Sequence, residues 1–359
     1  MITKLYVDNY RTMVNFSIEF NKLSILLGYN GAGKSSVFHV IQILRSILCD
    51  HIPVGEVIDT ESLTRWQNID VQTFELEAED DEGKYSYKLA VQHNREARSV
   101  RIKSEQVLFE GHTIFQMEDS HTQLFNDSYG TGPMISLDWN YSGVGMIDDR
   151  KDNKLLTRFK KLISKIIVCA PKPFMMNDRC FFEKKIPDYD MKEFPALVRY
   201  YIQEKPECIQ RWKEHLAENN PLLEQVFLSG NEEKILYFRM KNDDKSVYKA
   251  SELSDGERQI LLLHFLIDTF VSEGYSVFVD EPDNYIALSE MASLNMALED
   301  ASLQSGQCVV ISHHSEMIDF FASANGIWFD RGGYGITRIT EAPNPEDTFT
   351  YSEIMKMKG

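Results

Sequence analysis

The feature that most constrains this chain is a short glycine-rich segment, residues 28–35, which reads GYNGAGKS and fits the spacing GxxxxGK[ST]. An apolar strand pattern at 22–27 precedes it, and apolar residues at helical spacing follow from Val37 to Leu48. Glycines let phosphate approach the backbone N–H donors closely, and a helix start adds its positive dipole end. The segment predicts a phosphate-binding loop in a parallel α/β core, with Lys34 reaching the β- and γ-phosphates and the Ser35 hydroxyl binding Mg²⁺. A plain turn before a helix is the alternative, and the strand–helix context disfavours it.

Two later strand patterns end in side chains suited to nucleotide hydrolysis. Val277-Phe-Val-Asp280-Glu281 ends in two acids: Asp280 suits a magnesium shell, and Glu281 suits a base that polarises the attacking water. Cys308-Val-Val-Ile-Ser-His313-His314 ends in histidine, which suits a sensor of the γ-phosphate. Each pattern alone also fits a strand followed by a polar turn, so its weight comes from the order of the motifs along the chain.

A fourth segment, Leu253-Ser254-Asp255-Gly256-Glu257-Arg258-Gln259, opens the strongest helical pattern, residues 256–272. Ser254 is a good N-cap, and the start of a helix is again an anion site. By itself the segment is an ordinary capped helix. Its meaning depends on the three motifs described above.

Together these segments resemble the motifs of ABC-type ATPases of the RecF/SMC/OLD group, often described as AAA-type ATPases. Residues 5–38 are similar to the start of that group, and LSDGERQ, VFVDEPDNYIAL and VVISHHSEM resemble its signature, its Walker B with D-loop, and its switch. The resemblance covers residues 1–50 and 250–331. It implies an α/β fold, an ABC-type P-loop ATPase head with a large α+β insertion, or lid, between Walker A and the signature, and Mg²⁺-dependent ATP hydrolysis.

The resemblance also implies roles for single residues. The residues implied to bind the phosphates are Asn30, Gly31, Ala32, Gly33, Lys34, Ser35 and Ser36, and Arg11 is implied to lie near the nucleotide. Mg²⁺ is implied to bind Ser35, Asp280 and a Q-loop glutamine, and Glu281 and His313 are implied to be catalytic. Ser254, Asp255 and Gly256 are implied to contact the γ-phosphate that a second subunit binds. Gln67 is the expected Q-loop residue, and Gln72 competes with it. Ser315 replaces the proline common in the group, which keeps His314 as an alternative switch. The D-loop opens at Asp283-Asn284, but Ile286-Ala-Leu replaces the usual Leu-His-Pro.

The expected organisation has an N-terminal ATPase lobe at 1–52, an insertion or lid at 53–247, and the rest of the head at 248–359. Alternation at 71–78, 84–91 and 98–103 predicts an antiparallel meander. The glycine-rich stretch 128–148 is expected to be irregular loop. Further expectations are a helix at 151–166, a strand at 165–170, and helices near 193–204, 207–218 and 221–228.

The charge balance, 38 Lys and Arg against 55 Asp and Glu, gives −17, which disfavours unaided binding to DNA or to an acidic membrane. A local basic stretch, at or beside one predicted helix, is the exception: Arg150, Lys151, Lys154, Arg158, Lys160, Lys161 and Lys165. It suits a solvated face, a partner surface or a nucleic-acid patch. Five scattered cysteines fit a reducing cytoplasm. No signal peptide is expected, and the most apolar window, 260–271, is broken by His264 and Asp268, so no membrane span is predicted.

Three functions remain open. The first is a regulatory ATPase that dimerises head to tail around ATP, or forms a higher oligomer, and controls a separately encoded nuclease in anti-phage defence. The second is a RecF- or SMC-like ATPase of DNA repair or recombination. The third, a nucleotide-binding subunit of a transporter, is disfavoured by the large insertion and the divergent signature. The chain is expected to lack a nuclease site of its own.

Overall fold

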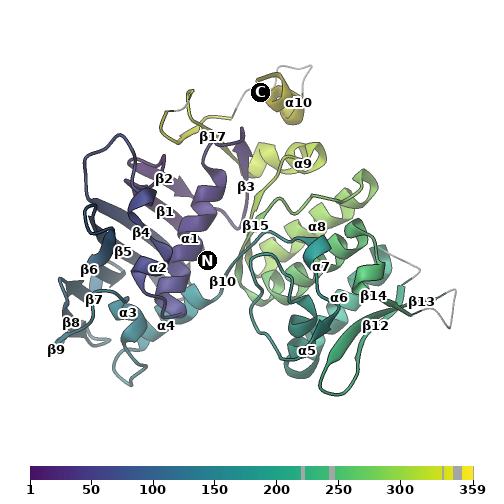
Figure 1. Cartoon of the computed structure of the whole chain (residues 1–359), viewed down its shortest axis with the longest axis horizontal. Helices are drawn as coiled ribbons and strands as arrows, with labels where there is room; N and C mark the ends of the chain where they lie inside the picture. The colour runs from purple at the N-terminus through teal and green to yellow at the C-terminus, as the bar shows by residue number, and fades with distance from the viewer. Residues whose placement is uncertain (220–222, 242–246, 334, 343–349, 359) are drawn as a thin grey trace. The chain divides into compact units, whose positions relative to one another are not determined.

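The computed structural model describes residues 1–359 except 220–222, 242–246, 334, 343–349 and 359. The chain forms two compact units (Figure 1). The first unit contains residues 1–21, 28–166 and 328–341, and the second contains residues 22–27, 167–327 and 342–359. The units group the chain differently from the three segments expected above, because the meander belongs to the same unit as the N-terminal strands.

An antiparallel sheet of eight strands dominates the first unit, in the order β2-β1-β4-β5-β6-β7-β8-β9. The strands are β1 (Ile2–Asp8), β2 (Phe16–Glu19), β4 (Val71–Asp80), β5 (Gly83–Asn94), β6 (Ser99–Phe109), β7 (His112–Glu118), β8 (His121–Phe125) and β9 (Thr131–Ser136). Alternate residues of β4 and β5 are buried, as the period of two requires. The predicted meander is confirmed, and it continues for three more strands.

The expectation of an irregular loop at 128–148 is wrong, because this stretch contains β9 and the short helix α3 (Gly143–Met146). Strand β9 lies at the sheet edge, and its residues are almost all exposed. An edge strand without a buried face leaves no apolar alternation in the sequence. Helix α3 is held by Glu105 of β6, whose carboxylate accepts hydrogen bonds from Ser142 Oγ and from the backbone N–H groups of Gly143 and Val144.

Helical elements accompany this sheet in the first unit (Figure 1). They are α1 (Lys34–Cys49), α2 (Val54–Val57), the 3₁₀ turn η1 (Thr60–Ser62), α3 and α4 (Lys154–Ser164). The predicted stripe of α1 from Val37 to Leu48 is buried, and the ring of Phe159 in α4 lies 5.6 Å from that of Tyr85. The last residues of β17 (Gly326–Asp330) pair with β18 (Arg338–Thr340) in the same unit.

The second unit is built on parallel strands in the order β10-β15-β16-β3. These are β10 (Ile166–Cys169), β15 (Ser276–Asp280), β16 (Gln307–Ile311) and β3 (Leu23–Gly28), and β15, β16 and β3 are parallel with nearly every residue buried. Its helical elements are α7 (Asp255–Thr269), α8 (Leu288–Gln304), α9 (Ser315–Asn325), α10 (Tyr351–Lys358), η2 (Pro173–Met175), η3 (Ala250–Glu252) and η4 (Val271–Glu273). The predicted helix at 256–272 and the strand patterns before Asp280 and His313 are confirmed as α7, β15 and β16.

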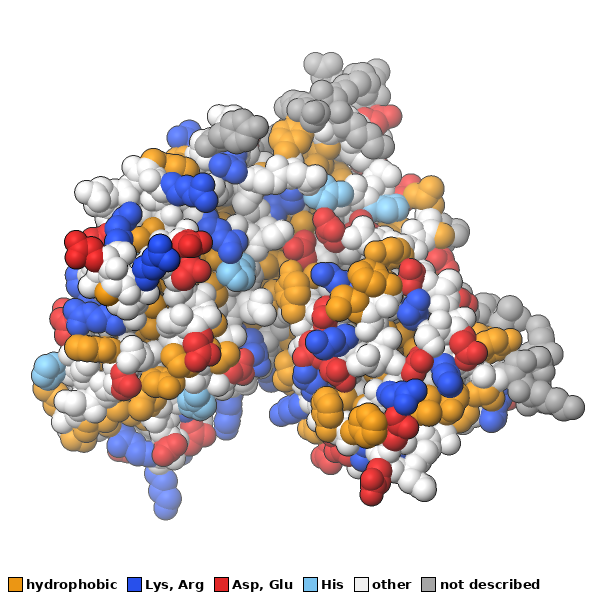
Figure 2. All heavy atoms as spheres, viewed as in Figure 1, with side chains coloured by type: hydrophobic (Ala, Val, Ile, Leu, Met, Phe, Trp, Pro, Cys, Tyr) orange, Lys and Arg blue, Asp and Glu red, His pale blue; other side chains and the backbone are white. Residues whose placement is uncertain are grey.

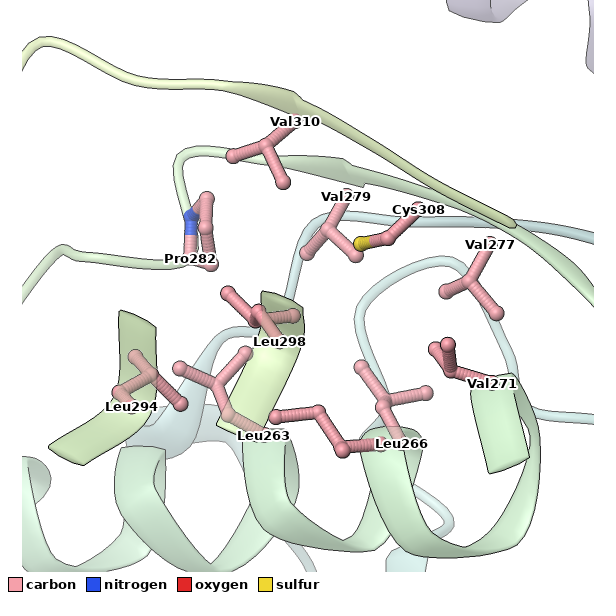
Figure 3. A pocket seen from close by; sticks show the side chains of 11 residues that line it. Leu263, Leu266, Val271, Val277, Val279, Pro282, Leu294, Leu298, Cys308 and Val310 are labelled. Atoms are coloured by element: carbon pink, nitrogen blue, oxygen red, sulfur yellow. The ribbon is translucent and has the colours of Figure 1, made fainter. Parts of the chain in front are cut away.

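Apolar side chains from α7, α8, β15 and β16 meet in the core of this unit (Figure 3). They surround a cavity of about 10 Å³, with Leu266 and Leu298 on the helices facing Val279 and Cys308 on the strands. A space this small and apolar is a packing defect, not a ligand pocket, because bound water or ligand requires polar partners. These apolar contacts pack α7 and α8 against β15 and β16.

A helical pair and a small sheet complete the second unit: α5 (Phe194–Glu204), α6 (Pro206–Asn219), and strands β11 (Arg179–Cys180), β13 (Lys234–Met240), β12 (Leu223–Ser229) and β14 (Val247–Lys249). The helix expected near 221–228 is wrong, because residues 223–229 form β12. Val226 of β12 pairs with Phe238 of β13, and only this non-local pairing selects the strand. None of the described helices is both long and apolar enough to cross a membrane.

Candidate functional site

The glycine-rich loop lies in the first unit, where the chain leaves β3 and enters α1. Gly28, Gly31 and Gly33 have φ values of 139°, 77° and 107°, which L side chains rarely adopt. Gly33 precedes the first helical residue, and no side chain of the described residues caps it. The predicted loop conformation is therefore present, with an uncapped helix start that suits an anion.

Lys34 turns back over this loop. Its ammonium donates hydrogen bonds to the carbonyl oxygens of Gly28, at 2.5 Å, and Tyr29, at 3.0 Å, and only 5% of the residue is exposed. Ser35 and Asn30 are exposed, while Ala32 is buried. The loop thus places a positive charge at its centre and a hydroxyl at its surface.

Thr337 supports the loop from behind, which the sequence did not reveal. Its hydroxyl donates to the Ala32 carbonyl at 3.0 Å and lies 2.8 Å from the hydroxyl of Thr12. A Cβ atom added to Gly33 would lie 2.5 Å from Thr337 Oγ1, so the glycine is required by packing as well as by its φ angle. Arg331 adds a hydrogen bond to the Gly31 carbonyl at 3.0 Å. These residues follow β17 without any periodic pattern, so no sequence signal marks them.

The predicted acid pair and histidine lie at one edge of the parallel sheet in the second unit. Asp280 at the end of β15 pairs with Ile311 of β16, and Ile311 pairs with Leu26 of β3. The carboxyl ends of the three strands therefore coincide, and each continues into a predicted motif: Asp280-Glu281, Ser312-His313, and the glycine-rich loop after Leu27. Ligands of open parallel sheets bind at this edge.

Glu281 has a strained backbone, with a φ of 50° that is uncommon for a non-glycine residue. Its N–H donates to the Ile311 carbonyl at 2.9 Å, and its exposed carboxylate accepts a hydrogen bond from Asn284 Nδ2 at 2.9 Å. Such strain is found where the surrounding structure holds a side chain for function. Asn284, expected to open the D-loop, thus orients the carboxylate of Glu281.

The two neighbouring histidines differ in what they do locally. His314 is the N-cap of α9: its Nδ1 accepts a hydrogen bond from the Glu316 N–H at 3.3 Å, and its own N–H donates to Ser312 Oγ at 3.0 Å. His313 is exposed at the end of the strand. Burial raises the pKa of the neighbouring Asp283, and a hydrogen bond from Ser312 opposes that shift. His314 is therefore engaged in capping α9, and His313 remains the predicted switch.

Tyr189 is a further side chain beside this edge that the sequence did not reveal. Burial, and then the negative charge of Asp280, raises the pKa of its phenol to about 12. At neutral pH the phenol, like that of other tyrosines, is protonated and can donate a hydrogen bond. It lies far from the motifs along the chain, and only folding brings it near Asp280.

The signature segment forms the start of α7 as predicted. Ser254 caps the helix: its hydroxyl accepts a hydrogen bond from the Glu257 N–H at 3.3 Å, and its own N–H donates to the Glu257 carboxylate at 2.9 Å. Gln259 is buried and donates to the Pro282 carbonyl at 2.6 Å. A Cβ atom added to Gly256 would lie 2.8 Å from the carbonyl oxygen of Tyr285. The signature is therefore packed directly against the segment that follows Glu281.

Asp255, beside Ser254 in the signature, forms an ion pair of 2.6 Å with Arg258. Of the two glutamines considered for the Q-loop, Gln72 is buried, and it hydrogen-bonds to the Asn9 carbonyl, at 2.9 Å, and to His93, at 3.0 Å. Gln67 lies half-buried in the loop before β4. The amide of Gln72 is thus engaged within the core of the first unit, and Gln67 remains the predicted Q-loop residue.

Arg11 is exposed next to the first turns of α1. It has a φ of 51°, and its guanidinium carbon lies 5.2 Å from the ring centre of Tyr10. The Tyr10 hydroxyl is 2.5 Å from Nδ1 of His39 in α1. The neighbour of Arg11 in the chain is thus fixed against α1 within the first unit.

The basic stretch is less free than the sequence indicates. Arg158 in α4 forms ion pairs with Asp80, at 2.8 Å, and with Glu82. Lys160 and Arg150 also lie beside acids, at 3.7 Å from Asp149 and 3.4 Å from Asp152 respectively. Much of the predicted positive charge is thus balanced within the first unit.

Comparison with known proteins identifies the family of the chain. Residues 1–194, more than half of the chain, match the family described as the AAA ATPase domain, and the chain belongs to this family. No protein with curated annotation matches it.

Solved SMC head structures share the fold. One is an SMC head bound to the C-winged helix domain of ScpA, with a TM-score of 0.57, 13% identity, and 94% of this chain and 96% of that chain covered. The SMC head domain from Thermotoga maritima has a TM-score of 0.50 and 12% identity, with 96% of this chain and 99% of that chain covered. A third structure is an SMC head domain with an extended coiled coil, bound to the C-terminal domain of ScpA derived from Pyrococcus furiosus. Its TM-score is 0.50 and its identity 13%, with 99% of this chain and 98% of that chain covered. The family match confirms the predicted ATPase, and the shared fold with SMC heads agrees with the predicted α/β, ABC-type architecture.

Proposed function

We propose that the chain binds and hydrolyses ATP with Mg²⁺ through the residues described above. The observation that carries the proposal is the shared edge of β3, β15 and β16, from which the glycine-rich loop, the acid pair and the histidine all continue. The donor set fits the ligand, since the loop offers an uncapped helix start, an ammonium and a hydroxyl, and the strand end offers carboxylates. Ser35 and Asp280 would hold Mg²⁺, which would neutralise the negative charge that develops on the phosphates.

In this proposal each side chain has a separate task. Lys34 exchanges its carbonyl partners at Gly28 and Tyr29 for phosphate oxygens. Glu281 accepts a proton from the attacking water, and Asn284 keeps its carboxylate oriented. His313 stabilises the γ-phosphate, and Gln67 completes the magnesium shell through the Q-loop.

The test is ATP binding and turnover in Lys34→Ala, with Lys4→Ala as the matched control. Lys4 is also in the first unit, but it pairs with Glu19 at 3.3 Å on the surface. We expect Lys34→Ala to lose nucleotide binding and Lys4→Ala to retain it. Unchanged affinity in Lys34→Ala would refute the assignment of the loop.

We further propose a head-to-tail dimer in which Ser254, Asp255 and Gly256 of one subunit contact the γ-phosphate bound by the other. The exposed hydroxyl of Ser254 at the start of α7 supports this role. Mixing Lys34→Ala with Ser254→Arg subunits should restore one intact shared site in each heterodimer. Mixtures that dimerise but stay inactive would count against shared sites that work independently.

We propose, third, that the ATPase regulates a separately encoded nuclease in anti-phage defence, in the cytoplasm. The acidic chain supports this reading over direct action on DNA, as does the face shown in Figure 2, where acidic and basic side chains are interspersed. The five cysteines are free thiols, as a reducing compartment requires. Cells with the ATPase and its neighbouring gene should resist phage, and cells with the ATPase alone should not. DNA cleavage by the isolated chain would overturn this proposal.

Charge reversal in the basic helix α4 distinguishes the regulatory function from that of a DNA-repair ATPase. Lys154→Glu with Lys161→Glu is the better perturbation, because changing Arg158 would also break its ion pairs with Asp80 and Glu82. Loss of DNA binding in this double variant, with basal ATP turnover unchanged, would favour the repair function. Loss of the protein partner instead would favour the regulatory one.

A further inference from the structure

A cluster of metal-ligating side chains from α6 and α7 lies outside every motif assigned above. Figure 1 labels these two helices in the second unit. His215 comes from α6, and His264 and Asp268 lie one helical turn apart on α7. Potential ligand atoms of the three residues all lie within 4.8 Å of one another. His264 and Asp268 interrupt the most apolar window of the sequence, residues 260–271.

The burial of this cluster is unusual for a structural ion pair. Asp268 is 1% exposed and His264 is 2% exposed. Asp268 Oδ1 lies 2.7 Å from His215 Nδ1, while Asp268 Oδ2 is buried without any hydrogen-bond partner among the described residues. A buried carboxylate oxygen without a partner costs free energy, and a bound cation is one way in which proteins satisfy it.

We infer that His215, His264 and Asp268 form a binding site for a divalent transition metal such as Zn²⁺. Two imidazole nitrogens and one carboxylate oxygen are ligands that zinc prefers, whereas magnesium prefers oxygen ligands. Zinc binds such atoms at about 2.0–2.2 Å, so side-chain movements of about 1 Å would bring this cluster to binding distance. The metal replaces the proton shared between His215 and Asp268.

The surroundings of the cluster are compatible with a cation. Arg211 is the nearby positive charge, and it donates to the Asp268 backbone carbonyl at 2.9 Å. Glu273 balances it, with an ion pair of 2.8 Å to the same guanidinium. Burial lowers the pKa of His264 to about 4, so its ring is uncharged at neutral pH, the form that binds metals. The His215 side chain is 41% exposed, which provides a route for the ion from solvent.

A metal at this position would join α6 to the helix that begins with the signature segment. The same two helices are already connected by a hydrogen bond of 3.0 Å from Trp212 Nε1 to the Leu261 carbonyl. The proposed site is therefore a clamp that fixes α7, with three protein ligands and an open position toward solvent. It does not depend on the assignment of the phosphate-binding residues.

The experiment is a Zn²⁺ titration of the full chain against a chromophoric chelator, in excess Mg²⁺ so that oxygen-ligand sites are occupied. We expect one equivalent of Zn²⁺ to bind, and His215→Ala and Asp268→Asn each to weaken it by at least about 100-fold, since even loss of a residue supporting a ligand costs about 10–100-fold. His121→Ala, which removes an exposed histidine of the first unit, is the matched control and should bind as the parent does.

A second readout separates metal ligation from loss of folding. Co²⁺ in a tetrahedral nitrogen and oxygen site absorbs visible light, so the parent and His121→Ala should show this absorption and His215→Ala should not. Far-UV circular dichroism should be equal in all variants, because His215 is partly exposed and Asp268→Asn preserves shape. Absence of tight Zn²⁺ binding in the parent, or equal affinity in His215→Ala, would overturn the inference.

Discussion

Replacing Gly33 by alanine tests how the phosphate-binding loop is held, and Gly31→Ala provides the matched control. Both glycines have positive φ, 107° and 77°, so a methyl group strains the backbone at either position. The two positions differ in the space available for an added Cβ atom. An added Cβ atom meets nothing within 4 Å at Gly31, but at Gly33 it lies 2.5 Å from Thr337 Oγ1 and 2.9 Å from Thr337 Cγ2.

The expected cost follows from these two terms. A left-handed conformation costs an alanine about 1–2 kcal/mol, and overpacking a well-filled site costs about 1–3 kcal/mol more. The lower entropy of the unfolded alanine chain affects both variants alike and cancels in the comparison. We therefore expect Gly33→Ala to be less stable than Gly31→Ala by about 1–3 kcal/mol in free energy of unfolding.

Urea unfolding of the two variants measures this difference, and Thr337→Ala identifies its origin. Without the Thr337 hydroxyl and methyl groups the nearest remaining atom is the Cβ of residue 337, at 3.3 Å, so the difference should shrink in that background. Thr337→Ala alone should also lose stability, since it removes the hydrogen bond to the Ala32 carbonyl. Equal stability of Gly33→Ala and Gly31→Ala would refute the conclusion that Thr337 packs against the loop.

The other predictions address catalysis and stability. Glu281→Gln should bind ATP normally but hydrolyse it about 10²–10⁴-fold more slowly in steady-state assays, because the amide cannot accept the proton. His313→Ala should reduce ATP turnover more than His314→Ala does. His314→Ala should lower the melting temperature more, because His314 caps α9. The reverse order in the turnover assay would identify His314 as the switch. Gln259→Leu should destabilise the chain by about 1–3 kcal/mol in urea unfolding, since the buried Pro282 carbonyl loses its donor. Burial lowers the pKa of His93 to about 4, so the unfolded chain binds more protons than the folded chain below pH 6.5. The free energy of unfolding should therefore fall as the pH is lowered from 6.5 to 4, and it should fall less steeply in His93→Gln. An equal pH dependence in the two proteins would show that His93 is not the cause.

The sequence by itself determined the class of the protein and the local form of its motifs. The Gly28–Ser35 spacing, the apolar strands before Asp280 and His313, and the Ser254 cap are local patterns, and local patterns follow from backbone sterics and helix capping. The structure has these elements with ends shifted by only a few residues. The parallel core was predictable for the same reason, since its buried strands are continuous apolar runs.

Tertiary structure alone decided which side chains support those motifs. Three contacts join residues that are distant along the chain: Thr337 with Gly33, Gln259 with Pro282, and His215 with Asp268, which is 53 positions further on. Strand β12 was predicted as a helix because its partner β13 is not visible in local periodicity. Such contacts depend on non-local pairing and close packing, which no short window of sequence encodes.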